Sequence, residues 1–401
     1  MLAFSVQMVA QKSPSEQLFD AAMTRYVPAE KYVWNWRDAV LLKSFIDIAR
    51  SEPQKRELVA DYVDKAMTRL APKAHGVHPN GVASAVGLAF LQEAGRNSME
   101  TDKALERVLW QYRSIVRSAN GACSHRAGTV ELWDDTVYMI GLTLIGSYHA
   151  TGDVTYVEEF ADQILAHAEH LCDPATGLWY HGWAETSFPA EDACSEYGWN
   201  TNRNHRNNEF WGRGNGWIAM SLADVLEVLP QSDERYAQIK DMFVQMMSTL
   251  LRLQDKKTGL WRQLPLHIKD KDNFLESSCT AMFGYAAAKG SRLGILSSDF
   301  SNSAQTAYDG IVKHCLVGLD TPELALSRIC AGTCIGDKDY YYARSQVSSG
   351  ETYAIGAVLM LANEINNLKQ YYHDVYKKNP CSHHVRFCTG FVLQILRGTS
   401  C

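Results

Sequence analysis

The 401-residue chain lacks the features that define a membrane, nucleic-acid-binding or modular protein. No apolar stretch approaches the roughly 20 residues that cross a bilayer. The net charge is -6 and no cluster of Lys and Arg forms a surface for nucleic acid. No tract rich in Pro, Gly or Ser divides the chain. We therefore expect one large soluble domain with neither a membrane nor a nucleic-acid partner.

Signals for export are also scarce. The opening stretch MLAFSVQMVAQKS has a short apolar run without a basic segment, so residues 1–20 are at best the remnant of a signal peptide. No Asn-x-Ser/Thr motif for glycosylation occurs. These absences favour a cytoplasmic protein. Ten cysteines leave a secreted, disulfide-bonded protein open, although scattered cysteines also serve as small apolar residues.

The motifs of common cofactor sites are missing as well. The chain has no phosphate loop, no G-x-G-x-x-G after a strand and no G-x-S-x-G elbow. CSHHVRFC, which spans 381–388 within the C-terminal extension 371–401, resembles a zinc half-site, but its spacing fits no closed set of four ligands. We expect neither a metal nor a cofactor.

Apolar residues recur at helical spacing along most of the chain, as in AVLLKSFIDIAR and IGAVLMLANEINNL. Alternation with a period of two residues is scarce, which predicts an all-α protein. The loops repeat: DPATGLWYH at 173–181 and DKKTGLWRQ at 255–263 each follow an amphipathic helix, and their glycines are expected to stop the helices. Uneven spacing and aromatic loops favour a closed ring of helical hairpins over residues 21–370, rather than an open solenoid.

FWGRGNGW, residues 210–217, precedes a helical pattern that Pro230 ends. With Asn215 and Gly216 at the helix start, Arg213 would stand just before an N-terminus, where a carboxylate is favoured. Trp211 and Trp217 could then form flat walls for a sugar ring. The alternative is a capped helix whose arginine pairs with a structural acid while both tryptophans pack in the core.

Two acidic residues, Asp134 and Asp135, stand at the start of another helix in ELWDDTVYM. One aspartate suffices as an N-cap, so the other is a candidate general acid. Burial would raise its pKa, whereas the helix terminus would lower it. His125 and His181, in the aromatic loops, could bind sugar hydroxyls or a carboxylate, or be ordinary loop histidines.

Five ordered stretches together resemble the unsaturated rhamnogalacturonyl hydrolases and the related unsaturated glucuronyl hydrolases, glycoside hydrolase families 105 and 88. They are LWDDTVYM, LWYHGW, FWGRGNGW, LESSCTAMFGYAAAKG and ICAGTCIGDKDYYYAR. The resemblance implies a single-domain (α/α)6 barrel without a metal or cofactor. It also implies removal of a 4,5-unsaturated uronic acid from the non-reducing end of an oligosaccharide, most simply a rhamnogalacturonan fragment. In that chemistry an aspartate protonates C4, water adds at C5, and the hemiketal opens.

The resemblance also implies roles for individual residues. The family motif W-x-D-[TG]-x-[YF]-M falls on Trp133 to Met139, which makes Asp135 the proton donor and leaves Asp134 as a helix cap. The positions that match the family's substrate-binding residues are Trp34, His125, His181, Trp211, Arg213 and Trp217.

One position departs from the family pattern. Asn80, in HPNGVASAVGLAFL, stands where the family usually has a second catalytic aspartate. An amide can bind a hydroxyl, but it cannot accept a proton or repel the charge of Asp135. A sugar-binding protein without turnover therefore stays open beside the hydrolase. A third interpretation is an epimerase in which His125 and His181 act as acid and base.

Overall fold

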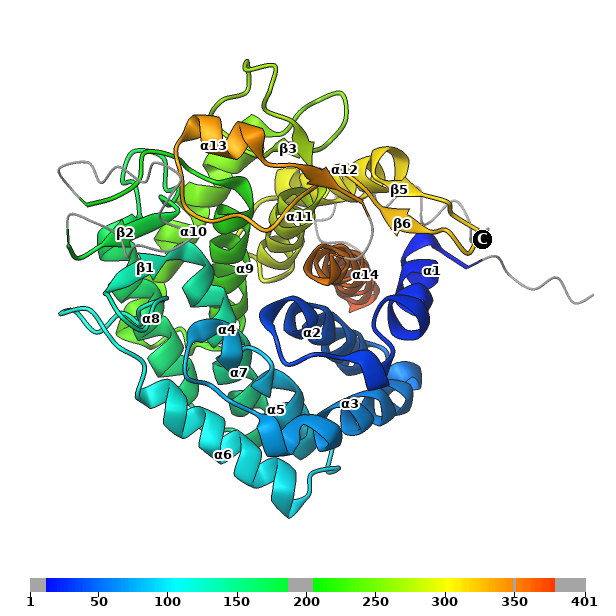
Figure 1. The fold of residues 1–401 in the computed structure, drawn as a ribbon. Helices are drawn as coiled ribbons and strands as arrows, with labels where there is room; N and C mark the ends of the chain where they lie inside the picture. Colours follow the sequence, from blue (N-terminus) through cyan, green and yellow to red (C-terminus); the bar gives the residue numbers. More distant parts are fainter. Residues whose placement is uncertain (1–11, 187–204, 349–350, 379–401) are drawn as a thin grey trace, which may run out of the picture.

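The computed structural model describes residues 12–186, 205–348 and 351–378. Within this part of the chain, six inner helices contact one another in sequence order and close into a ring, because the last of them packs against the first (Figure 1). The inner helices are α2 (Trp36–Ser51), α5 (Ala85–Glu93), α7 (Asp134–Thr151), α9 (Gly212–Val228), α11 (Ser277–Arg292) and α14 (Thr352–Lys378). This arrangement confirms the predicted (α/α)6 barrel.

Outer helices alternate with the inner ones along the chain and pack on the outside of the ring. They are α1 (Pro14–Ala21), α3 (Arg56–Leu70), α6 (Met99–Arg113), α8 (Thr155–Leu171), α10 (Glu234–Leu253) and α12 (Ser298–His314). Two short helices, α4 (Pro79–Val82) and α13 (Lys338–Ala343), lie in connections. None of the described helices combines the length and the apolar character that a membrane span requires.

Inner and outer helices differ in burial as the sequence pattern requires. Nearly every side chain of α7, α9 and α11 is buried, including the serines and threonines of these helices other than Thr151 at the end of α7. The outer helix α10 buries one stripe, which contains Tyr236, Ile239, Phe243, Met246 and Leu250, and exposes its polar face. A helix that is apolar on all sides belongs in the middle of a protein, so the pattern itself separates the two rings.

Short antiparallel strand pairs connect the loops that precede the inner helices. They are β1 (Glu131–Trp133) with β2 (Gly182–Ala184), β3 (Trp261–Arg262) with β4 (Leu275–Glu276), β5 (Leu316–Val317) with β6 (Ala325–Leu326), and β7 (Ile329–Cys330) with β8 (Gln346–Val347). In the first pair, Trp133 lies opposite Gly182. That register brings the start of α7 beside His181.

The repeated D-x-x-T-G-L-W loops have the same local structure. Asp173 accepts hydrogen bonds from the amide and hydroxyl groups of Thr176, and Asp255 does the same with Thr258. The following glycines, Gly177 and Gly259, have φ of 72° and 76°, so both are left-handed. Neither glycine stops its helix as predicted, because α8 ends at Leu171 and α10 at Leu253.

The predicted terminal segments overlap the barrel. Helix α1 extends to Ala21 and packs against α14, and α14 itself continues to Lys378. Residues 1–11 and the CSHHVRFC stretch lie outside the described residues. Among the described cysteines, Cys334 is disulfide-bonded, whereas Cys123, Cys172, Cys279, Cys315 and Cys330 are free thiols.

Candidate active site

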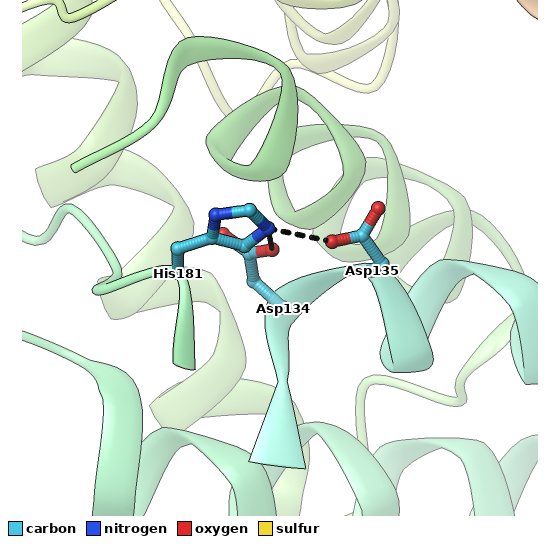
Figure 2. Close-up of side chains that lie close together, drawn as sticks. All are labelled: Asp134, Asp135 and His181. Atoms are coloured by element: carbon cyan, nitrogen blue, oxygen red, sulfur yellow. Dashed lines mark hydrogen bonds and ion pairs between the residues drawn. The ribbon is translucent and has the colours of Figure 1, made fainter. Parts of the chain in front are cut away.

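Two carboxyl groups and an imidazole meet at the N-terminus of α7 (Figure 2). Asp134 and Asp135 are the first residues of this helix, and the Asp134 amide donates to the carbonyl oxygen of His181 at 3.1 Å. The His181 ring thereby reaches over the helix start, and its Nε2 lies 3.2 Å from Asp135 Oδ2 and 3.9 Å from Asp134 Oδ1. Local strand pairing thus assembles groups that are 46 residues apart in sequence.

A hydrogen bond from a distant tyrosine determines which nitrogen of His181 carries the proton. The Tyr341 hydroxyl lies 2.7 Å from His181 Nδ1, and burial raises the pKa of this tyrosine well above its usual range. Burial also lowers the pKa of His181, although the bond to Asp135 opposes that shift. A neutral imidazole that accepts the Tyr341 proton at Nδ1 must carry its own proton at Nε2. His181 therefore donates to Asp135.

Asp135 receives a hydrogen bond on each carboxylate oxygen. His181 Nε2 donates to Oδ2, and the indole Nε1 of Trp217 donates to Oδ1 at 3.1 Å. Burial alone would raise the pKa of Asp135, but hydrogen bonding from His181 outweighs it and holds that pKa well below its usual range. The side chain of Asp135 is 17% exposed, whereas those of Asp134 and His181 are fully buried. Asp135 is therefore the member of the group that a substrate can reach.

Asp134 is not the helix cap that the sequence predicted. The N-cap of α7 is Trp133, and no side chain caps this helix end. Neither carboxyl oxygen of Asp134 has a hydrogen-bond partner among the described residues. Burial, reinforced by the charge of Asp135, raises the pKa of Asp134 well above its usual range. The capping prediction fails because the His181 loop and α9 enclose the side chain that would otherwise turn back to the helix amides.

His125 lies on the other side of the helix start. Its ring stacks on Trp133 at 4.4 Å between centroids, and its Nδ1 is 2.9 Å from the Thr136 hydroxyl oxygen. Burial lowers the pKa of His125 to about 4, so the imidazole is neutral. Asn80 is half-buried in α4, which packs on α7. Both residues flank the helix that carries Asp135.

Arg213 is buried and bound to main-chain oxygens. Helix α9 begins at Gly212, so the sequence prediction of a start near Asn215 was wrong, and Arg213 lies in the first turn. Its guanidinium donates to the carbonyl oxygens of Cys330 at 2.7 Å and Ala331 at 3.1 Å. It also stacks over Trp211 at 4.2 Å. In this conformation Arg213 fixes the 330–331 segment.

The predicted aromatic walls are also buried. Trp211 is 1% exposed and stacks on His181, and Trp217 is 0% exposed and binds Asp135. Trp34 donates its indole proton to the carbonyl oxygens of His75 and Gly81. Trp211 and Trp217 therefore support His181 and Asp135, whereas Trp34 fixes the chain at and before α4.

Three features of the site were not predicted from the sequence. They are the presence of Trp36, the presence of Tyr341, and a position of Asp134 other than that of a helix cap. Trp36 is half-buried at the start of α2, where its ring meets Trp217 edge to face at 6.2 Å. In the stretch Trp34-Asn35-Trp36, the sequence pattern indicates Trp36 as a candidate as strongly as it indicates Trp34. Tyr341 is one of three consecutive tyrosines, and nothing in the sequence distinguishes it from its neighbours.

The acid–acid–histidine group can carry out proton transfer. Its three ligand-type atoms lie within 4.8 Å of one another, the spacing of a potential metal site among the described residues. However, His181 is already hydrogen-bonded to Asp135, so the geometry is that of a proton-transfer group. An ionised, partly exposed carboxylate beside a buried acid with a raised pKa is typical of general acid–base catalysis.

Comparisons with known proteins give the family of this chain. The unsaturated rhamnogalacturonyl hydrolase YesR of Bacillus subtilis is 25% identical over 328 residues, which cover 79% of this chain and 86% of that protein. A family 105 glycoside hydrolase of C. acetobutylicum has a similar structure, with a TM-score of 0.76, 22% identity, and coverage of 89% of this chain and 100% of that one. A possible family 105 member from Salmonella enterica superposes with a TM-score of 0.71 at 25% identity over 91% of this chain and 100% of that one. The sequence model of Glycosyl Hydrolase Family 88 matches residues 12–369, so the chain belongs to this family and is a hydrolase.

Proposed function

We propose that this hydrolase removes the 4,5-unsaturated uronic acid from the non-reducing end of oligosaccharides, most simply unsaturated rhamnogalacturonan fragments. The name of the Bacillus subtilis relative supports this substrate class. The observation that carries the proposal is the position of Asp135. It is a partly exposed carboxylate, fixed on both oxygens, beside a neutral His181 and a buried second acid.

The reaction is a hydration of the enol-ether double bond. Asp135, once protonated, donates a proton to C4 of the unsaturated ring, and the positive charge that develops at C5 is shared with the ring oxygen. Water then adds at C5 and loses a proton to the Asp135 carboxylate. The product is a hemiketal, which opens and releases the rest of the oligosaccharide. No covalent sugar–enzyme bond forms, so one partly exposed carboxyl group suffices.

The surrounding groups give Asp135 its orientation. Trp217 and His181 hold one oxygen each, so the carboxyl group cannot rotate freely and presents a defined face to the substrate. The N-terminus of α7 contributes positive potential, which favours the uronate carboxylate. Trp36, half-buried beside Trp217, offers a ring against which a sugar can pack.

Loss of ultraviolet absorbance tests the proposal, because hydration removes the double bond conjugated to the carboxylate. We expect the wild type to consume this absorbance with unsaturated disaccharides from pectin, and Asp135→Asn to abolish the activity while leaving the melting temperature within a few degrees. A panel that adds unsaturated disaccharides from ulvan, heparin, chondroitin and hyaluronan defines the aglycone. If the wild type leaves every absorbance unchanged, the hydratase assignment is wrong.

The asparagine at position 80 supports a second candidate, a sugar-binding protein without turnover. Asn80 lies on α4 against α7, where a carboxylate could act on the same substrate but an amide cannot accept a proton. Calorimetric binding of an unsaturated disaccharide without loss of absorbance, followed by turnover in Asn80→Asp, would favour this candidate over the enzyme.

A further inference from the structure

Asp134 is an acidic side chain of the site to which the proposed chemistry gives no role. It is 0% exposed, and both of its carboxyl oxygens lack hydrogen-bond partners among the described residues. An ionised carboxylate cannot remain in such surroundings at an acceptable free energy, whereas a neutral carboxylic acid can. The side chain is nevertheless held between Gly214 of α9 and the ring of His181.

The neighbouring element is shaped to admit this carboxyl group. Gly214, in the first turn of α9, lies so close that a Cβ built on it would be 2.1 Å from Asp134 Oδ2. Any other residue at 214 would displace the acid. The His181 ring also lies against the carboxyl group, with Nε2 at 3.9 Å from Oδ1 (Figure 2). The acid is therefore aimed into the Asp135–His181 pair.

The charged and titratable groups around Asp134 come from four elements. Asp135 follows it on α7, His181 and Tyr341 face it from the β2 loop and from α13, and Arg213 acts on it from α9. His125 influences Asp135 from the far side. Asp135 is stabilised as the ionised partner by two donors, and Asp134 has none. A single proton shared by the two acids therefore resides on Asp134.

We propose that Asp134 is a positioning residue that stores the proton delivered by Asp135 to the substrate. The inference rests on the proposed hydration. An oxygen of Asp134 lies within 4.8 Å of an oxygen of Asp135, so a rotation of the buried carboxyl group brings its O–H to the second acid. In the first step the O–H bond of Asp134 breaks and an O–H bond forms on Asp135, which then donates its proton to C4. Water adds at C5 and returns a proton to the Asp135 carboxylate, and this proton moves back to Asp134. The two acids end as they began, and the net reaction consumes one water.

The first test is independent of substrate. Asp134→Asn keeps the volume of the side chain but cannot titrate. Because the folded pKa of Asp134 is raised, the wild-type carboxyl group contributes its full stability below the unfolded pKa of about 4 and loses it as the pH rises through the folded value. We expect the melting temperature of the wild type to fall relative to that of Asp134→Asn as the pH rises above this range. A difference that does not change with pH overturns the proposal.

The second test is kinetic. Asp134→Asn should lower kcat at neutral pH by roughly 100-fold, the contribution of a general acid, with little change in KM because the buried side chain does not touch substrate. Activity should recover as the pH falls toward the range in which Asp135 takes a proton directly from solvent. Asn fits the same space, so a merely structural role predicts an unchanged pH profile, and that result would refute the inference.

A matched control is Asp38→Asn. Asp38 is another buried aspartate near the start of an inner helix, but it accepts hydrogen bonds from the Val33 amide and the Thr352 hydroxyl. Its substitution should leave the shape of the kcat profile unchanged. Failure of the proposed function can be distinguished from failure of the inference about Asp134. If the wild type hydrates no unsaturated uronide but the pH-dependent stability difference is present, the proposed function is wrong, and the inference that Asp134 holds a proton is retained.

Discussion

At the scale of single residues, Tyr341 determines how His181 serves Asp135. Its hydroxyl donates to His181 Nδ1, which leaves the imidazole proton on Nε2, 3.2 Å from the Asp135 carboxylate. Without this donor the proton can move to Nδ1, and Nε2 would then direct a lone pair at a carboxylate oxygen. A buried phenolic group therefore controls the polarity of the hydrogen bond between His181 and Asp135.

We expect Tyr341→Phe to lower kcat about tenfold, the effect of one lost hydrogen bond of roughly 1.4 kcal/mol. The bond from His181 lowers the pKa of Asp135, so its weakening should raise that pKa and move the acid limb of the kcat profile to higher pH. The measurement is kcat against pH. Tyr342→Phe is the control, because this neighbour on α13 donates to Asp270 instead. Equal profiles for both variants would contradict the tautomer argument.

At the scale of single residues, the sequence indicated candidate residues better than it indicated their contacts and burial. Asp135 could be proposed as a candidate acid because its motif is local. Its hydrogen bond with His181 could not be predicted, since the two residues lie 46 positions apart. Trp211 and Trp217 were identified as aromatic but expected to form open walls, whereas both are buried. Burial depends on what the rest of the ring places over a side chain. The contact of Tyr341 with His181 spans 160 residues and leaves no local pattern.

At the scale of elements, the first turn of α9 supports two parts of the site. Its Arg213 holds the Cys330 and Ala331 carbonyl oxygens, and the Tyr353 hydroxyl donates to the same Cys330 oxygen at 2.8 Å. The glycines of this turn allow neighbouring groups to approach the helix backbone. The helical periodicity identified α9 but placed its start too late, because three glycines in five residues resemble a loop unless tertiary packing is known.

Substitution of Gly214 tests this role. In an ordinary helix Gly→Ala stabilises by about 1 kcal/mol, but at position 214 the new Cβ would meet Asp134 Oδ2 at 2.1 Å, so we expect a net loss of about 1–3 kcal/mol from overpacking. Chemical denaturation measures the loss, and kcat should fall with it because Asp134 moves. Gly146→Ala, in α7, is the helical control, since its nearest contact is Val86 Cγ2 at 3.3 Å. Similar stability for both variants would contradict the close approach.

At the scale of the whole molecule, the inner helices run parallel and divide the barrel into two chemically different ends. Side chains from their N-terminal turns meet around Asp135, as the contacts of Trp36 with Trp217 and Tyr353 show. Helix N-termini carry partial positive charge, which favours both an ionised Asp135 and an anionic substrate. The ring of hairpins was predictable from helix periodicity and loop repeats, because both are local patterns. The chemical difference between the two ends of the barrel, by contrast, follows from the closed ring and not from a local pattern.

The opposite end holds a charged network around a cavity of about 250 Å³. Three cations lie in the last turns of inner helices, where the helix dipole favours them: Arg50, Lys289 and Arg292. Lys43, from the middle of α2, also lines the cavity. Lys289 donates to Asp224 at 2.7 Å and to Glu227 at 2.8 Å. These ion pairs close the end of the barrel that has no part in the proposed chemistry, so stability and catalysis should be separable.

Lys289→Met should therefore lower the free energy of unfolding by about 3 kcal/mol, because it leaves the buried Asp224 without its nearest cation, and should leave kcat unchanged. Glu227 is partly exposed and keeps its ion pair with Arg292. The charge of Lys289 lowers the pKa values of Asp224 and Glu227 against the opposing effect of burial. The stability that these two acids contribute is therefore present above their unfolded pKa of about 4, and it is lost as the pH falls through their folded pKa values. The difference in melting temperature between wild type and variant should consequently narrow in acid. Lys240→Met, on the exposed face of α10, should change neither quantity. A fall in kcat for Lys289→Met at a temperature where it remains folded would show that the two ends of the barrel are coupled.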